Sequence, residues 1–461
     1  MRQRIDDAVS ALSNDVVETL QKWIRIPSEK KPPEDDAPFG KPLREMLDVA
    51  LQDAERLGFR VRNFDGYIGD IEIGDGEQTM GVLAHLDVVP AGDGWVHNPF
   101  GAEIIDGKIY GRGTGDDKGP AVAALFALKA VKDAGLPLKK KVRLILGCDE
   151  ESGWEDIRYY QERVDMPDFG FSPDATYPVI NAEKGILQMK LAAKLSGEEK
   201  ADRPVFQVRS GERPNVIPGL ATAEIGCDDI QGLQKELQET GLPVVAERLE
   251  NGHVLLTSTG MAGHASMPEL GKNAAGQLLL ALKAIGAGGG CRSFIECLTD
   301  GIGLDSSGKG LGIDGADSVS GPLTINLGVL RMTNDRAEAV IDIRHPVLMS
   351  ADAIAKMISM RVLEAGIKVE VTTAKAPLHV PAESRIVREL LSVYHEVTGL
   401  PPYTIAIGGG TYSRSMDQCV AFGSNFPGDP ELAHQAGEYI EIDKLLLNVR
   451  IFAHAIARLA G

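Results

Sequence analysis

Two short apolar runs that each end in metal-ligand side chains constrain the fold of this chain more than any other feature. Residues 80–84 lead into the motif HLD, and residues 141–147 lead into the motif CDEES. Short apolar runs bounded by glycine and polar residues are typical of buried strands. Open α/β sheets carry their chemistry at the carboxyl ends of such strands. The pattern therefore predicts an α/β sheet with an imidazole and several carboxylates at one edge.

Apolar residues at helical spacing surround these predicted strands. The spacing predicts helices over residues 5–24, 43–57, 121–134, 386–398 and 442–459, and residues 59–64 resemble a further strand. Alternating helices and strands of this kind indicate an α/β domain.

The pattern of predicted secondary structure changes near residue 185, where longer strand–helix–strand units begin. One unit spans residues 214–258 and a similar one spans residues 333–373. This self-similarity predicts an inserted domain, residues 187–380, made of two related halves, with residues 1–186 and 381–461 forming the other domain. The glycine-rich stretch 301–321 between the halves is expected to be a solvent-exposed loop.

Composition and charge exclude several classes of protein. A chain of 461 residues with 43% apolar residues is expected to form two globular domains. The formal net charge of −18 argues against nucleic acid or an anionic membrane as a partner, because such a surface repels phosphates. Neither a signal peptide nor a run of transmembrane length is evident. Five cysteines without a Cys-x-x-Cys pair predict reduced thiols in a cytoplasm.

The acidic and histidine motifs point to a metal site. Residues i and i+2 of a strand face the same way, so Asp87 can hold the His85 imidazole in the tautomer that a metal needs. On its own, HLD is more often structural. In GRGTGDDKGP, four glycines permit a sharp turn that would bring an aspartate of the DD pair toward His85.

Each acidic motif has an alternative interpretation, a solvated turn for DDKG and a charged helix start for the Glu150–Glu151 pair. The first motif lies between predicted buried elements, where unpaired carboxylates are costly and metal ligation removes that cost. Of two adjacent glutamates, one can bind a metal while the other acts as a general base. Two divalent cations (+4) balance three ligating carboxylates and a bridging hydroxide (−4), which favours two metals over one.

In this order the motifs HLDVVP, GRGTGDDKGP, DEESGW, SPDATYPV, GHASMPELGKNAA and GGGTYSR resemble the bimetallic zinc exopeptidase family, which includes carboxypeptidase G, succinyl-diaminopimelate desuccinylase and the peptidase V type of bacterial dipeptidase. The resemblance covers essentially the whole chain and is closest to the peptidase V branch. It implies a mixed-sheet metallo-exopeptidase catalytic domain with an inserted α+β lid domain of two similar halves. Cys148, where the family often has threonine, and Gly437, where asparagine is common, are departures that remove no ligand.

The resemblance also implies roles for individual residues. His85, Asp116 and Asp174 would bind one metal, and Asp116, Glu151 and His434 the other, so that Asp116 bridges. Glu150 would be the general base, Asp87 would orient His85, and the peptide bond between Asp116 and Asp117 would be cis.

Substrate contacts follow from the same resemblance. His264 would stabilise the oxyanion, and Asn215 and Arg344 would bind the substrate backbone and its carboxylate, which suits the planar guanidinium fork. Gly409, Gly410 and Thr411 would lie near the substrate terminus.

The expected function is that of a cytoplasmic, monomeric, metal-dependent dipeptidase that uses two zinc ions, or manganese or cobalt in their place. It would hydrolyse short peptides, mainly dipeptides with a free N-terminus, through a water that bridges the metals and Glu150 as base. An N-acyl amino acid amidohydrolase of the same family and a non-catalytic peptide-binding protein are the alternatives. A dipeptidase must also accept the free amine, for which Asp117 or a backbone carbonyl is a candidate.

Overall fold

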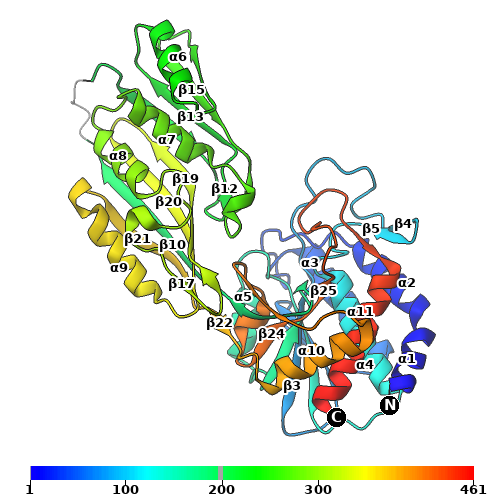
Figure 1. The fold of residues 1–461 in the computed structure, drawn as a ribbon. Helices are drawn as coiled ribbons and strands as arrows, with labels where there is room; N and C mark the ends of the chain where they lie inside the picture. The colour runs from blue at the N-terminus through cyan, green and yellow to red at the C-terminus, as the bar shows by residue number, and fades with distance from the viewer. Residues whose placement is uncertain (1, 196–200) are drawn as a thin grey trace. The chain divides into compact units, whose positions relative to one another are not determined.

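The computed structural model describes residues 2–195 and 201–461. The chain divides into two compact units, each with its own sheet and core (Figure 1). Unit 1 comprises Met1–Asn181, Val380–Ile405 and Gly410–Gly461, and unit 2 comprises Ala182–His379 and Ala406–Gly409. Unit 2 is therefore an insertion in the sequence of unit 1.

The main sheet of unit 1 has the strand order β1-β2-β6-β3-β7-β24-β9. These strands are β1 (Arg60–Phe64), β2 (Ile68–Ile73), β3 (Thr79–His85), β6 (Lys141–Gly147), β7 (Phe169–Ser172), β9 (Val179–Glu183) and β24 (Cys419–Ala421). The central pairs β6–β3, β3–β7 and β7–β24 are parallel, whereas β1–β2, β2–β6 and β24–β9 are antiparallel. The prediction of a mixed α/β sheet is confirmed.

Helices cover both faces of this sheet. They are α1 (Arg2–Ala11), α2 (Ser13–Ile24), α3 (Lys41–Arg56), α4 (Lys118–Asp133), α5 (Glu155–Gln161), α10 (Arg385–Thr398) and α11 (Ile442–Ala460). Helices α4 and α11 contact the central strands β3 and β6, and α1, α2 and α10 pack with them. On the opposite face, α5 and the 3-10 helix η4 (Tyr412–Ser415) close a core over β2, β3 and β6. The helix predicted over residues 5–24 is divided at Leu12, where the Ser13 hydroxyl bonds the Ser10 carbonyl.

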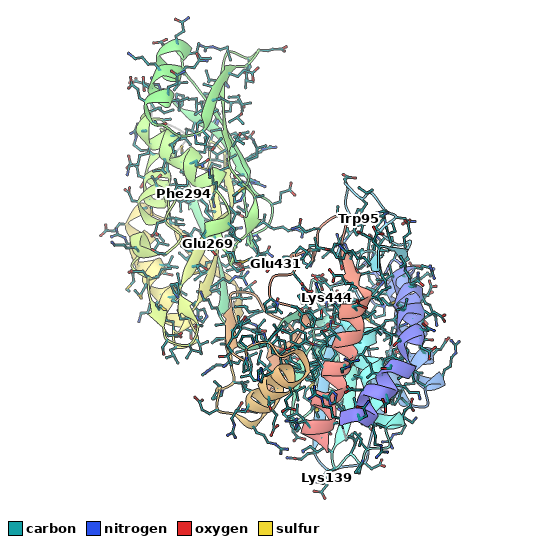
Figure 2. The ribbon with its side chains drawn as sticks, turned by 45° about the vertical axis from the view of Figure 1, so that its right-hand side comes forward. Trp95, Lys139, Glu269, Phe294, Glu431 and Lys444 are labelled. Carbon is teal, nitrogen blue, oxygen red and sulfur yellow. The ribbon has the colours of Figure 1, made fainter. Side chains whose placement is uncertain are left out.

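Two small sheets complete unit 1. They consist of β4 (Glu103–Ile105), β5 (Lys108–Tyr110) and β26 (Tyr439–Glu441), and of β8 (Ala175–Thr176) with β25 (Ser424–Asn425). Antiparallel pairing joins β5 to β26, so the chain leaving β5 at residue 111 runs beside the residues that precede β26. On α11, Lys444 pairs with Asp429 at 2.6 Å (Figure 2).

Unit 2 is built on an antiparallel sheet with the order β14-β15-β13-β11-β19-β20-β10-β21. Its strands are β10 (Gly185–Lys194), β11 (Val205–Ser210), β13 (Leu220–Ile225), β14 (Val244–Arg248), β15 (Val254–Thr259), β19 (Thr324–Met332), β20 (Arg336–His345) and β21 (Lys368–Lys375). Shorter strands are β12 (Val216–Ile217), β16 (Gly263–His264), β17 (Ala316–Asp317), β18 (Gly321–Pro322), β22 (Leu378–His379) and, at the second crossing between the units, β23 (Thr404–Ile407).

The helices of unit 2 share one apolar core with this sheet. They are α6 (Ile230–Glu239), α7 (Ala274–Ala284), α8 (Arg292–Gly301) and α9 (Ala351–Val362), with 3-10 turns η1 (Pro268–Leu270), η2 (Lys309–Leu311) and η3 (Leu363–Ala365). Phe294 of α8 belongs to this core (Figure 2). In one half β13 is followed by α6, β14 and β15, and in the other β20 is followed by α9 and β21. The halves meet where β11 pairs with β19.

The glycine-rich stretch 301–321 is only in part the solvent-exposed loop that was predicted. Ile302, Leu311 and Ile313 are buried in the core of unit 2. Their apolar side chains hold the connection against α8 and the sheet, an outcome that the glycine content alone does not suggest.

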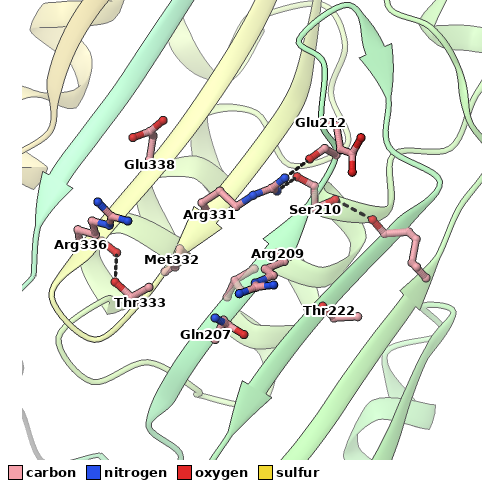
Figure 3. Close-up of a pocket in the computed structure, with 13 residues that line it drawn as sticks. Gln207, Arg209, Ser210, Glu212, Thr222, Arg331, Met332, Thr333, Arg336 and Glu338 are labelled. Carbon is pink, nitrogen blue, oxygen red and sulfur yellow. Dashed lines mark hydrogen bonds between the residues drawn. The ribbon is translucent and has the colours of Figure 1, made fainter.

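A polar hollow of about 650 Å³ lies on the sheet of unit 2 (Figure 3). Its lining includes Arg209, Thr222, Arg331 and Glu338, and none of the predicted site residues. Two of the guanidinium nitrogens of Arg331 donate to backbone carbonyls in this face. The hollow is therefore not the predicted active site, despite its size.

Candidate active site

Three neighbouring parallel strands of unit 1 bring the predicted ligands together. His85 ends β3, the Glu150–Glu151 pair follows β6, and Asp174 follows β7. In the sheet β3 lies between β6 and β7, and His85 is in register with Gly147, the last residue of β6. The loops after these strands therefore leave one edge of the sheet side by side, as the sequence predicted.

Two groups of ligand atoms form at this edge and share Asp116. His85 Nε2 lies 3.0 Å from Asp116 Oδ1 and 3.7 Å from Asp174 Oδ2. His434 Nε2 lies 2.8 Å from Glu151 Oε1 and 3.2 Å from Asp116 Oδ2. Within each group the ligand atoms lie within 4.8 Å of one another. Asp116 thus directs one oxygen to each group, which is the arrangement that a bridging carboxylate requires.

The electrostatics of these groups fit divalent cations. Burial and the neighbouring Asp116 raise the pKa of Asp174 to about 7. Burial also raises the pKa of Glu151, and the hydrogen bonds that His434 donates to Asp116 and Glu151 raise the pKa of His434 to about 10. These shifts indicate an excess of buried negative charge that protons neutralise in the absence of another cation. Oxygen and imidazole donors of this kind suit zinc and related metals.

Asp87 does more than orient the imidazole. His85 Nδ1 lies 2.9 Å from the backbone oxygen of Asp87 and 3.4 Å from its carboxylate. The two carboxylate oxygens of Asp87 accept hydrogen bonds from the backbone N–H groups of Glu150 and Glu151, at 3.1 and 3.0 Å. Asp87 therefore ties the end of β3 to the turn that carries both glutamates, a link that the i, i+2 spacing does not reveal.

Glu150, the predicted general base, lies in the turn after β6, directly after Asp149. Burial and the negative charge of Asp174 raise its pKa well above the ordinary value. A raised pKa suits a carboxyl group that must accept a proton and later release it near neutral pH.

Asp117 lies next to the shared ligand but points into the protein. Its side chain is 0% exposed, and Oδ2 accepts a hydrogen bond from the backbone N–H of His85 at 3.0 Å. The peptide bond between Asp116 and Asp117 is cis, as the resemblance implies. Asp117 therefore braces the end of β3, and its candidacy as the acceptor of a substrate amine stays a prediction.

Two further buried carboxylates were missed by the sequence analysis. Glu438 accepts hydrogen bonds from Arg112 and from three backbone N–H groups of the turn that leads to Asp116. Asp156 accepts them from the backbone N–H groups of Cys148 and Asp149 and from the Tyr412 hydroxyl. The one sequence feature that could have pointed to Glu438 and Asp156 is that each lies a few residues after a predicted metal ligand.

The Cys148 thiol packs in the interior of unit 1. Burial raises its pKa well above the ordinary value, which makes it a poor nucleophile. In this environment Cys148 is a packing residue.

Unit 2 brings two of the predicted substrate residues together. His264 in β16 is in register with Val216 of β12, and the backbone N–H of Ala265 donates to the Asn215 carbonyl at 2.9 Å. The side-chain amide of Asn326 donates to the carbonyls of Pro214 and Val216, at 3.0 Å each. Asn215 is thus held from both sides, beside His264.

Arg344 is buried and already engaged. Asp342 accepts hydrogen bonds from its Nε and Nη2 atoms at 2.6 and 3.1 Å, and the Gly408 carbonyl accepts one from Nη1 at 2.8 Å. These bonds use three of the five N–H donors of the guanidinium and leave two on its outer edge. Gly409 follows this contact within unit 2.

The remaining loop residues lie in unit 1. Gly410 precedes Thr411, and the Thr411 hydroxyl caps η4 by accepting from the backbone N–H of Ser413. A Cβ atom at Gly410 would lie 2.6 Å from the Nε atom of Arg414, so a side chain there would displace that guanidinium.

Comparisons with known proteins place the chain among peptidases. Residues 81–458 match the family described as Peptidase family M20/M25/M40. The chain is 40% identical over 454 residues to the putative dipeptidase YtjP of Bacillus subtilis, covering 97% of each chain. It is 32% identical over 464 residues to the Beta-Ala-Xaa dipeptidase of Lactobacillus delbrueckii subsp. lactis, covering 98% of this chain and 97% of that one.

Solved structures share the fold at low sequence identity. Human carnosine dipeptidase 1 has a TM-score of 0.61 at 16% identity, covering 99% of this chain and 98% of that one. The aminoacylhistidine dipeptidase of Vibrio alginolyticus has a TM-score of 0.60 at 16% identity, covering 98% of each. Within the described ranges, none of the helices combines the length and apolar character needed to span a bilayer.

Proposed function

Because the chain belongs to the peptidase family M20/M25/M40, whose members are metal-dependent hydrolases, we propose that it is a dipeptidase acting on peptides with a free N-terminus. Relatives named as dipeptidases match it along nearly the whole chain, so the proposal concerns the complete two-unit protein.

The observation that carries the proposal is the pair of ligand groups that share Asp116 beside the Glu150–Glu151 turn. We assign His85, Asp116 and Asp174 to one metal ion and Asp116, Glu151 and His434 to a second. Zinc is the proposed metal, with manganese or cobalt able to replace it. Such cations polarise a scissile carbonyl and lower the pKa of water.

The residues of the chain have separate tasks in this proposal. Glu150 accepts a proton from the attacking water and passes it to the leaving amine, which its raised pKa favours. Asp87 keeps both His85 and the Glu150–Glu151 turn in place. His264 donates to the developing oxyanion, for which an imidazole N–H is well suited.

Recognition of a short peptide is assigned to groups that bind its ends. The two N–H donors left on the outer edge of Arg344 can take the terminal carboxylate in two bonds. Asn215 contacts the substrate backbone, and Gly409, Gly410 and Thr411 lie near its terminus. With Asp117 buried, the acceptor for the free amine is assigned to backbone carbonyls.

We further infer a cytoplasmic monomer. The five cysteines, all of which fall within the described residues, form no disulfide, which fits a reducing compartment. The two halves of unit 2 join into one sheet within a single chain and so provide internally a surface that a dimer would otherwise supply. Light scattering should give a mass near 49.3 kDa, and a value twice as large would contradict the monomer.

The experiment that tests the function is hydrolysis by metal-stripped protein, with and without added zinc, manganese or cobalt. The substrates are Leu-Leu, β-Ala-His, a tripeptide and N-acetyl-Leu. Metal-dependent cleavage confined to the free-amine dipeptides supports the proposal. Cleavage of N-acetyl-Leu alone would assign the protein to the amidohydrolases, and no cleavage at all would indicate a binding protein.

A further inference from the structure

Glu438 holds the turn that carries the shared ligand Asp116. Its Oε1 atom accepts from the backbone N–H groups of Gly113, Gly115 and Asp116, at 3.0, 2.8 and 3.3 Å. Its Oε2 atom accepts from Arg112 Nη1 at 2.7 Å. Both charged side chains are buried. One carboxylate thus binds the cation of Arg112 and three backbone N–H groups of the turn.

The turn has other anchors at its beginning, and Asp117 is anchored directly after it. The backbone N–H of Gly111 donates to the Glu438 carbonyl, and the backbone N–H of Arg112 donates to the Pro99 carbonyl, at 2.9 and 2.8 Å. The Thr114 hydroxyl donates to the Gly111 carbonyl. By contrast, the backbone N–H groups of Gly115 and Asp116 donate to Glu438. The last residues of the turn therefore depend on this carboxylate.

The short segment 434–438 contacts both the side chain and the backbone of Asp116. His434 approaches Asp116 Oδ2 at 3.2 Å, and Glu438, four residues later, binds the Asp116 backbone. On the far side of Asp116, Oδ1 approaches His85 at 3.0 Å. The direction in which the Asp116 carboxylate points is thus fixed from the backbone by Glu438.

We infer that Glu438 is a positioning residue for metal binding, holding Asp116 so that its two oxygens serve both metal groups at once. This inference rests on the proposed metal groups but not on the proposed substrate. Since Asp116 belongs to both groups, a displaced turn weakens both sites together. Loss of Asp174 or of Glu151 should instead weaken one site each.

The Glu438→Gln variant tests the inference with little change in shape. The amide oxygen can still face the three backbone N–H groups, but the amide NH₂ then faces the Arg112 guanidinium, donor against donor. Arg112 loses its buried counter-charge and the turn shifts to relieve the conflict. Residues that orient metal ligands typically change metal affinity by about 10- to 100-fold when mutated.

The readout is zinc affinity and stoichiometry of the full chain, measured by competition with a chromophoric chelator, together with the melting temperature of the metal-free protein. Glu438→Gln is expected to weaken both binding steps by about 10- to 100-fold. Asp174→Asn and Glu151→Gln are the comparators and should each weaken one step. Asp70→Asn is the matched control, because Asp70 is a buried carboxylate of unit 1 bound to Arg62 and Tyr160.

Asp70→Asn should lower the melting temperature and leave both zinc affinities unchanged. If Glu438→Gln behaves in the same way, or weakens only one step, the inference is overturned. Should Glu438→Gln fail to fold, Glu438→Asp keeps the charge near Arg112 but withdraws the oxygens from the three amides, and the same two-step loss is required of it. Peptide hydrolysis is not part of this readout, so failure of the dipeptidase assignment would be seen separately.

Discussion

Removing the Tyr412 hydroxyl tests how strongly the turn before Glu150 is held. Asp156 is buried and accepts from the backbone N–H groups of Cys148 and Asp149 at 2.6 and 2.9 Å, as well as from this hydroxyl. In Tyr412→Phe the ring can stay in the core against Trp154, whose ring centre lies 5.3 Å away. A hydrogen bond to a charged group contributes about 1.5–3 kcal/mol, and the free energy of unfolding should fall by that amount.

The pH dependence of this loss has a definite sign. Burial raises the pKa of Asp156 to about 7, while the hydrogen bond from Tyr412 lowers it. Because the pKa of Asp156 is higher in the folded than in the unfolded state, the free energy of unfolding falls as the pH rises, until the pH has passed about 7. Without the hydroxyl this pKa moves higher still. The difference in stability between wild type and Tyr412→Phe should therefore be larger at pH 9 than at pH 6.

The assay is urea unfolding of the metal-stripped protein at both pH values, with Tyr177→Phe as the matched control. Tyr177 is also buried, but its hydroxyl donates to the neutral Asn448 amide oxygen at 2.9 Å. That bond should contribute only about 0.5–1.5 kcal/mol, with little change between the two pH values. A loss for Tyr412→Phe below about 0.5 kcal/mol, or one larger at pH 6, would refute the reasoning.

Three further predictions concern the site itself. Glu150→Ala should lower turnover by several orders of magnitude while zinc content and folding survive; near-normal turnover would contradict the assignment of the base. Arg344→Lys should raise the Michaelis constant for Leu-Leu far more than that for its C-terminal amide, since only the former offers the carboxylate, and equal changes would contradict that role. Because the folded-state pKa of His434 is raised to about 10, its contribution to the stability of the metal-free protein is present below pH 6.5 and lost as pH rises through about 10. His434→Asn should flatten the stability profile over this range, and an unchanged profile in urea unfolding would contradict the pairing.

The sequence predicted the elements that rely on local signals. Apolar runs of strand length placed β3 and β6, and helical spacing placed α4, α10 and α11 within a few residues of their observed bounds. The ligand-bearing ends of β3 and β6 could be anticipated because parallel strands end at a common edge, whereas Asp174 after β7 was assigned only through the family resemblance. The buried anchors of the stretch 301–321 were missed because its glycines dominate the local pattern, whereas its few apolar residues decide where it packs.

The contacts that hold the site could not be predicted because their partners are remote in sequence. Arg112 and Glu438 are 326 residues apart, and Asp156 and Tyr412 are 256 residues apart. No periodicity or motif links such pairs, and each acidic residue has an ordinary surface interpretation when it is viewed alone. The metal ligands can be predicted from sequence motifs, whereas the buried carboxylates that hold their turns can be found only once the pairing of distant segments is known.

The supporting carboxylates share one physical task. Asp87, Asp117, Asp156 and Glu438 each accept hydrogen bonds from backbone N–H groups at or beside the predicted ligands and the general base. Those ligands lie at strand ends and in turns, where backbone N–H groups lack the partners that a sheet or helix provides. A carboxylate satisfies two or three of them at once and fixes their direction. The backbone thus partly compensates the charge of the supporting acids, and Asp116, Glu151 and Asp174 remain as the three carboxylates assigned to the metals.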